Sequence, residues 1–450
     1  MWARAARRNS LSTPRTPQEP SRIGPNCSPR LRRLTLYSAK DYESDVQSQT
    51  KNARPNQLGD GLTTSGASFD GVTVARSLYS LIRSHADDTE RERRLAGPVV
   101  DALRSSGLFL MGLASALGGL ETPIGVALRA IEEVSFADGA SGWNVMIVFD
   151  TDLWAGFLRG ASRDLIGSIS RPIVTGTLSS PGRIEKTDRG YRISGRWKFG
   201  SGCQHSDVVL AGALLCESEK PVIGPNGAPE MLQIALRASE INILDTWRVT
   251  GLRGTGSHDF TIDNLLVAAE RALPLNITTP VERGPLYAFP MLASFAVAKG
   301  AVSLGIARHA IDAFKEIARS KVPATKTNPL RERPAAQIDL AHAEALVHSA
   351  RAFLYQSVEE GWRELIAGNA ISQQLRALIR LAATDCVQRC TQAVDLMYHA
   401  AAATAIHESC ELERCFRDAH VVTAHIVVQP ALYEAVGRVL LDLPPDTAVW

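Results

Sequence analysis

The sequence predicts an α+β fold in which a helical bundle, a β-domain and a second helical bundle follow one another. Apolar residues recur at helical spacing between residues 72 and 158. Near residue 170 the composition shifts to short runs rich in Val, Thr and Ser, which Gly, Pro and Asn separate. Four long apolar-periodic segments then occupy residues 291–440. Because helices and strands are segregated and do not alternate, a Rossmann fold is disfavoured.

Residues 1–70 differ from the rest of the chain. The first 40 residues contain eight arginines and one acid, Glu19, and residues 41–70 are polar. Such a composition cannot bury a core, so we expect a disordered extension. An Arg- and Ser-rich start is also typical of a targeting segment, and an extension upstream of the true start is the alternative. Apart from that possible signal, we expect a cytoplasmic protein.

The predicted N-terminal helical domain comprises residues 71–168. We expect helices at 72–85, 87–106, 125–134 and 140–158. Acids near the start of the second helix suit the positive end of a helix dipole, and Gly107 ends it.

The predicted β-domain comprises residues 169–278 and is expected to be antiparallel. Its strands are placed at 172–180, 191–197, 207–216, 231–237, 241–244 and 258–267. The remaining residues, 279–450, are predicted to form a four-helix bundle. Its helices are expected at 291–320, 334–367, 371–403 and 411–440, with short antiparallel connections.

Composition excludes several classes of protein. A net charge of +2 gives no support for nucleic acid as a partner. No run of 18 apolar residues occurs, so we expect no membrane span. Seven cysteines in a chain of 450 residues do not predict a disulfide scaffold. A zinc site at Cys386, Cys390, Cys410 and Cys415 is disfavoured by the spacing, and we expect no metal.

Three stretches resemble a known family. They are Glu132–Asn144, the segment YRISGRWKFGSGCQHSD at 191–207, and the segment DTWRVTGLRGTGSHDFTID at 245–263. With the α, β, α order, they resemble the acyl-CoA dehydrogenase fold and the two-component flavin monooxygenases built on it, over about residues 72–445. The resemblance implies a homotetrameric oxygenase component that binds reduced FMN or FAD. It would hydroxylate an aromatic or heteroatom-containing small molecule through a flavin C4a-hydroperoxide. No GxGxxG motif follows a strand, so a separate flavin reductase is expected to supply the electrons.

The resemblance assigns flavin contacts to small residues in two loops. Phe199, Gly200, Ser201 and Gly202 match the loop that lies against the isoalloxazine, which places Ser201 near N5 and C4a as a candidate catalytic residue. Thr177 matches a second loop more loosely. Arg253 can pair with flavin or phosphate oxygens. The alternatives are a surface turn for the first loop and a solvated hairpin arginine for Arg253.

The late stretch RDAHVVTAHI at 417–426 carries the candidate proton-transfer residue. Aligned with the Arg-Asp-Ala motif of the dehydrogenases, it puts Ile426 at the position of their catalytic glutamate, and the adjacent His425 can exchange a proton near neutral pH. His420 points about 140° away on an ideal helix, so it is a candidate substrate contact or a structural or subunit contact. Trp143 and Asn144 are candidate substrate contacts, with core packing as the alternative for Trp143.

Two departures from the dehydrogenases leave alternatives open. Residues 395–401 contain no glycine, and no Arg-x-x-Phe-Gly pattern lies between the first two C-terminal helices. Tight FAD binding is therefore not expected, and a flavin delivered by a reductase fits better. The alternatives are an acyl-CoA dehydrogenase with a relocated or missing catalytic base, and a non-catalytic scaffold.

Overall fold

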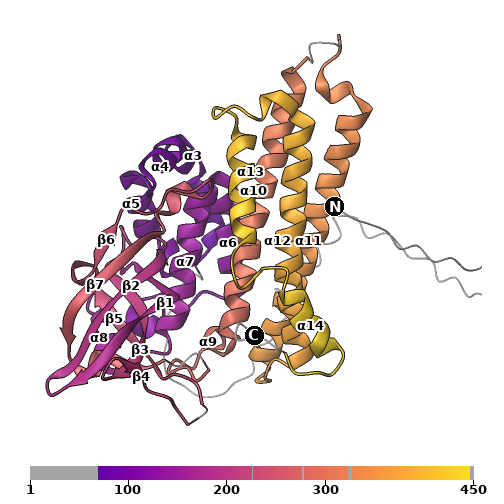
Figure 1. Ribbon diagram of the computed structural model, residues 1–450. Helices are drawn as coiled ribbons and strands as arrows, with labels where there is room; N and C mark the ends of the chain where they lie inside the picture. The colour runs from indigo at the N-terminus through magenta and orange to yellow at the C-terminus, as the bar shows by residue number, and fades with distance from the viewer. Residues whose placement is uncertain (1–68, 226, 276–277, 323–326, 446–449) are drawn as a thin grey trace, which may run out of the picture. The chain divides into compact units, whose positions relative to one another are not determined.

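The computed structural model describes residues 69–450 except 226, 276–277, 323–326 and 446–449. For residues 178–181 it describes the backbone only. The predicted extension therefore lies almost wholly outside the described residues. Within them, helices come first, strands follow, and long helices end the chain (Figure 1).

Seven helices occupy the N-terminal part of the described chain: α2 (Gly71–Ser77), α3 (Tyr79–Ser84), α4 (Ala86–Glu92), α5 (Gly97–Ser106), α6 (Ile124–Ala137), α7 (Gly139–Ala155) and α8 (Gly160–Gly167). The prediction of one helix over 87–106 is wrong. Arg93 adopts a left-handed conformation with φ 55°, and Pro98 opens the next helix because it needs no N–H partner there. Asp138 caps α7, since its Oδ2 accepts from the Ser141 N–H and hydroxyl at 2.7 Å each.

The strands are β1 (Val174–Thr187), β2 (Gly190–Gly200), β3 (Val208–Glu217), β4 (Lys220–Pro221), β5 (Met231–Arg237), β6 (Asn242–Leu244), β7 (His258–Val267) and β8 (Ala272–Pro274). They form one sheet in the order β6-β7-β2-β1-β3-β5-β8, with β4 beside β3. The expectation of a wholly antiparallel sheet is wrong, because β1 and β3 pair in parallel from Val174–Val208 onward. Strand β2 pairs with one edge of β1 in the antiparallel sense, and β3 pairs with the other edge in the parallel sense after a crossover.

The C-terminal part contains α9 (Pro285–Ala288), α10 (Met291–Ser320), α11 (Pro334–Ile366), α12 (Gln373–Ala401), α13 (Glu411–Thr423) and α14 (Leu432–Leu440). The first three long helices lie where they were predicted. The fourth prediction, one helix over 411–440, is wrong because α13 ends at Thr423 and α14 begins at Leu432. Pro430 lies between them, and its ring and missing N–H prevent a continuous helix. Short 3₁₀ turns occur at 108–110, 115–117, 238–240, 253–255, 269–271, 330–332 and 402–404.

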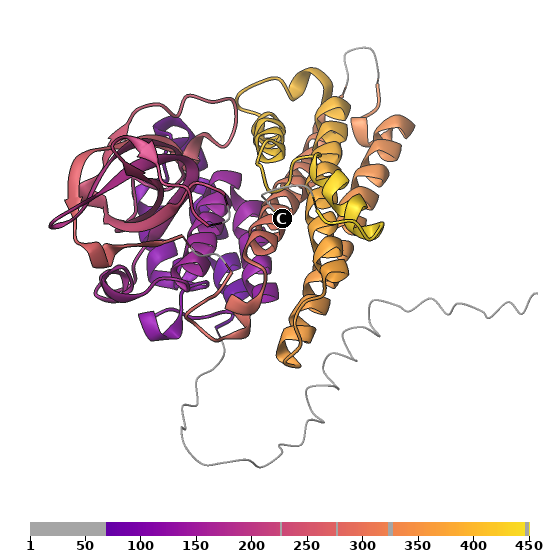
Figure 2. The same ribbon diagram turned by 60° about the horizontal axis from the view of Figure 1, so that its bottom comes forward.

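Helix α10 is the centre of the described helices. It contacts α6 and α7 on one side and α12 and α13 on the other, and both views place the sheet beyond α7 (Figures 1 and 2). Its length and apolar composition would suit a membrane span, yet 94% of that window is buried within the protein. The helix is therefore best explained as a core helix, which packs the N-terminal helices against the C-terminal ones.

Candidate active site

A glycine-rich loop leaves the end of β2 and carries four predicted residues. Phe199 adopts φ 60° and Gly202 φ 71°, so the loop turns sharply. A Cβ on Gly202 would lie 2.8 Å from Asn144 Oδ1, so the loop packs directly on α7 only because this residue has no side chain. Phe199 is 57% exposed and meets the Trp247 ring edge-on at 6.3 Å.

Ser201 lies inside a chain of hydrogen-bonded hydroxyls. Trp143 Nε1 donates to Ser201 Oγ at 3.2 Å, and Ser201 Oγ lies 2.6 Å from Ser257 Oγ. Ser257 Oγ lies 2.7 Å from Thr255 Oγ1, and Thr255 donates to the Leu252 carbonyl at 2.8 Å. Ser201 itself is 4% exposed, so bulk water barely reaches it.

His425 contacts this cluster through the ring of Trp143. It lies in the turn after α13, and not on a continuous helix as expected, and its ring meets the Trp143 ring edge-on at 5.8 Å. The Val427 N–H donates to Nδ1 at 3.3 Å, which places the proton of a neutral ring on Nε2. Burial, followed by the charges of Lys299 and Arg380, lowers the pKa of His425 well below its usual value. The imidazole is therefore neutral at physiological pH.

A buried ion pair lies behind Trp143. Lys299 of α10 pairs with Asp150 of α7, and its Nζ lies 6.0 Å from the centre of the Trp143 ring. Burial raises the pKa of Asp150 to about 6 although Lys299 opposes the shift. Among the described residues, Asp150 Oδ1 has no hydrogen-bond partner. Sequence reasoning missed both residues, although a lone lysine within an apolar helical segment is itself a signal, since a buried charge needs a partner.

The other predicted residues lie outside this cluster or have protein partners. The Thr177 hydroxyl is buried and donates to the Lys198 carbonyl at 2.9 Å. Arg253 donates to the Val249 carbonyl and pairs with Glu90 at 3.3 Å. His420 is exposed, lies 2.9 Å from Asp395 and contacts the Phe416 ring. These contacts give Arg253 and His420 structural partners, and their ligand roles stay predictions.

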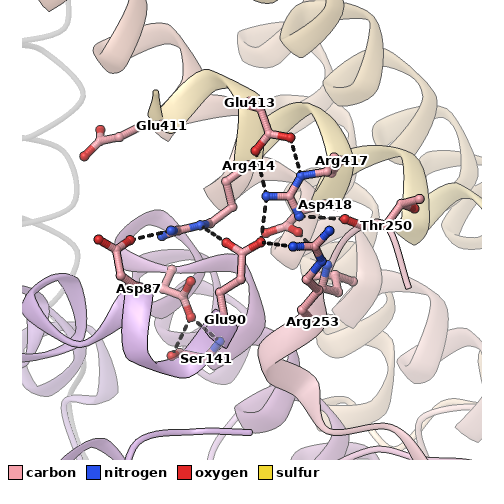
Figure 3. Close-up of polar contacts among 12 residues, drawn as sticks. Asp87, Glu90, Ser141, Thr250, Arg253, Glu411, Glu413, Arg414, Arg417 and Asp418 are labelled. Carbon is pink, nitrogen blue, oxygen red and sulfur yellow. Dashed lines mark hydrogen bonds and ion pairs between the residues drawn. The ribbon is translucent and has the colours of Figure 1, made fainter. Parts of the chain in front are cut away.

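A second polar cluster, which sequence reasoning also missed, locks α13 onto α4. Glu90 accepts from Arg414, Arg417 and Arg253, and Figure 3 shows the three guanidinium groups converging on its carboxylate. One residue along α13, Asp418 accepts from the Leu252 N–H at 2.5 Å. Burial, with a contribution from Asp138, raises the pKa of Asp418 to about 7. This cluster fixes the helix whose end carries His425.

The residues around the glycine-rich loop fit a flavin. The loop offers backbone without side chains at Gly200 and Gly202, which permits close approach of a flat ring. Ser201 has an acceptor position beyond its two partners. Beside Gly202, the Thr175 hydroxyl is fully buried and has no hydrogen-bond partner among the described residues. A buried polar atom of this kind needs a ligand or water, and the polar edge of an isoalloxazine supplies such groups.

Comparisons with known proteins show what the chain is similar to. The model described as acyl-CoA dehydrogenase, C-terminal domain, matches residues 297–430. Indole-3-acetate monooxygenase of Pseudomonas putida is 28% identical over 363 residues, which cover 81% of this chain and 91% of that protein. The oxygenase component of an FADH2-dependent resorcinol hydroxylase from Rhizobium sp. (strain MTP-10005) is 28% identical over 384 residues, covering 81% and 92%. The crystal structure of the HsaA monooxygenase of M. tuberculosis has a TM-score of 0.77 at 26% identity, covering 86% of this chain and all of that one. Over more than four fifths of its length, the chain is therefore similar to flavin-dependent monooxygenases, and a model of acyl-CoA dehydrogenases matches part of its C-terminal helices.

Proposed function

We propose that this chain is the oxygenase component of a two-component monooxygenase that hydroxylates an aromatic small molecule with reduced flavin and O2. The observation that carries the proposal is the meeting of Ser201, Trp143 and His425, which come from three distant segments. The relatives named for indole-3-acetate and resorcinol act on aromatic rings, which supports the substrate class.

The residues of the cluster have distinct proposed roles. Bound reduced flavin supplies the two electrons that activate O2. Ser201 would hold the N5 edge of the ring, and the exposed Phe199 would offer an aromatic surface beside the glycines. The neutral His425, with its proton on Nε2, would donate a hydrogen bond to an oxygen atom placed between it and Ser201. Trp143 orients the Ser201 hydroxyl and forms a wall that keeps water out.

Partners and layout follow from the same proposal. A flavin reductase is the electron donor, and the cofactor is reduced FMN or FAD. The domains run over 71–168, 169–278 and 279–450.

A homotetramer fits the C-terminal helices, whose exposed apolar side chains include Ile338 and Ile366 of α11. The exposed Ile426, beside His425, cannot act as the glutamate of an acyl-CoA dehydrogenase does.

The test mixes the protein anaerobically with reduced FMN or FAD and then admits O2 in a stopped-flow cell. The proposal expects a transient absorbance band that differs from those of reduced and oxidised flavin. In His425→Ala this band should decay about tenfold faster, because one hydrogen bond is lost. His348→Ala is the control, because that side chain is 80% exposed on α11, and it should leave the band unchanged.

Other outcomes identify the alternatives. Direct return to oxidised flavin without the band would contradict the monooxygenase proposal. Reduction of bound flavin by an acyl-CoA would indicate a dehydrogenase. A chain that binds neither reduced nor oxidised flavin would be a scaffold.

A further inference from the structure

We propose that Ser257 and Thr255 are positioning residues that fix the Ser201 hydroxyl as an acceptor, so that the site selects reduced over oxidised flavin. The inference rests on the proposed function, because it takes Ser201 to face the flavin N5. It assigns roles to two residues that do not themselves need to touch the flavin.

The direction of the hydroxyl chain follows from counting protons. Each hydroxyl has one proton to donate and two positions at which to accept. Thr255 donates its proton to the Leu252 carbonyl at 2.8 Å, so it can only accept from Ser257, 2.7 Å away. Ser257 therefore donates to Thr255 and has no proton for Ser201. At 2.6 Å from Ser257, Ser201 must be the donor of that bond.

One acceptor position on Ser201 then remains. Trp143 Nε1 occupies the other acceptor position, because an indole N–H can only donate. With its proton committed to Ser257, Ser201 presents an acceptor and no donor to a ligand. Ser201 is only 4% exposed, and Ser257 and Thr255 are buried as well. Water therefore does not readily change the direction of these hydrogen bonds.

An acceptor at this position distinguishes the two flavin states. Reduced flavin carries a hydrogen on N5 and donates there, whereas N5 of oxidised flavin has a lone pair and accepts. A Ser201 that can only accept forms a hydrogen bond with N5–H of reduced flavin. Against oxidised flavin, its lone pair faces the lone pair of N5, and no hydrogen bond forms. One hydrogen bond formed in one state and missing in the other corresponds to about a tenfold difference in affinity.

Thr255→Val and Thr255→Ser form the decisive pair of variants. Valine has nearly the shape of threonine but cannot accept, so Ser257 becomes free to donate to Ser201, and Ser201 becomes free to donate to N5. Serine keeps the chain intact. The measurement is the ratio of the dissociation constants for oxidised and reduced FMN, taken anaerobically with the full-length protein.

We expect the wild type and Thr255→Ser to bind reduced FMN more tightly, and Thr255→Val to lose about tenfold of that selectivity. The midpoint potential of bound FMN should fall by about 30 mV in the valine variant, since tenfold corresponds to 29.6 mV for a two-electron couple. Ser257→Ala, which removes the acceptor of the Ser201 proton, should have the same effect and serves if the valine variant folds poorly. Ser206→Ala is the control, because that buried hydroxyl donates to the Cys203 carbonyl at 2.9 Å, outside the chain.

Two failures are distinguishable. Preference for reduced FMN that persists unchanged in Thr255→Val and Ser257→Ala would overturn the inference and leave the proposed function intact. Absence of binding of either form by the wild type would overturn the proposed function itself. Equal affinity of the wild type for both forms would also overturn the inference.

Discussion

Replacement of Lys299 by methionine tests whether the buried pair behind Trp143 is an ion pair at neutral pH. Methionine fills the space of the lysine stem but removes the charge next to Asp150. With Lys299 present, the pKa of Asp150 is about 6. Without it, burial alone acts on the carboxyl, and buried acids reach pKa values of about 8–9. A rise of two to three units at about 1.4 kcal/mol per unit corresponds to roughly 3–4 kcal/mol.

The sign of the pH dependence follows from which state binds the proton. At pH 5 Asp150 is mostly protonated in both folded proteins, so the charge of Lys299 contributes little. At pH 8 the wild type holds an ionised pair, whereas the variant must keep a proton that the unfolded chain releases. The free energy of unfolding of Lys299→Met should therefore fall relative to the wild type by about 3 kcal/mol between pH 5 and pH 8.

Urea unfolding at half-unit pH intervals measures this difference. Lys315→Met is the matched control on the same helix, because Lys315 pairs with Glu344 at 2.8 Å near the surface. Its cost should stay below about 1 kcal/mol and not change with pH. If the wild-type and Lys299→Met curves run parallel from pH 5 to pH 8, the reasoning is refuted, since Asp150 then does not depend on Lys299 for its charge.

Three further predictions concern the loop and α13. Gly202→Ala should lower the free energy of unfolding by roughly 2–3 kcal/mol in thermal unfolding, because the cost of an alanine at φ 71° adds to that of the 2.8 Å contact. Gly227→Ala is the control, because Gly227 has a φ of 77° but open space around it, so this variant shows the cost of the backbone conformation alone. Glu90→Gln should lower the free energy of unfolding by about 2 kcal/mol, since three arginines lose their shared partner. The control is Asp87→Asn, which should cost less than about 1 kcal/mol because the Asp87 side chain is 88% exposed. Equal costs would contradict the central role of Glu90. The wild type should lose stability as pH rises from 4 to 7, because the pKa of the Asp418 carboxyl is about 7 in the folded protein and 3.8 in the unfolded chain, and Asp418→Asn should remove this loss. Urea unfolding midpoints measured across that pH range check the prediction. If the midpoints of the wild type and the variant change equally with pH, Asp418 is not responsible.

Local signals in the sequence predicted most elements, and tertiary effects caused the errors. The bounds of β5, β7 and α10 agree with the predicted ranges, because each combines a clear apolar period with breakers at its ends. Pro430 was a visible signal that 411–440 is not one helix. The left-handed Arg93 and the parallel pairing of β1 with β3 had no such signal, since both depend on what the chain packs against.

The candidate site divides in the same way. The resemblance pointed to Ser201, Trp143 and His425, and the structure brings these three together. Their support was not predictable, because it consists of pairs far apart in the sequence. Lys299 and Asp150 are separated by 149 positions, so spacing cannot reveal the pair. Ser257 was within a recognised stretch, but its role depends on the direction of a hydroxyl chain that only the three-dimensional arrangement defines.

Leu252 joins the two halves of the site through one strained residue. Its φ of 50° is left-handed, which costs a bulky residue about 1–3 kcal/mol and persists only where neighbours enforce it. Here they do: Asp418 accepts from its N–H, while the Thr255 hydroxyl and Trp247 Nε1 donate to its carbonyl at 2.8 and 3.1 Å. Asp418 belongs to α13, which ends two residues before His425. Thr255 is the first of the three hydrogen-bonded hydroxyls that lead to Ser201. The backbone of Leu252 thus connects the two candidate catalytic residues by a second route, beside the direct one through Trp143, and the strain at Leu252 is the cost of that connection.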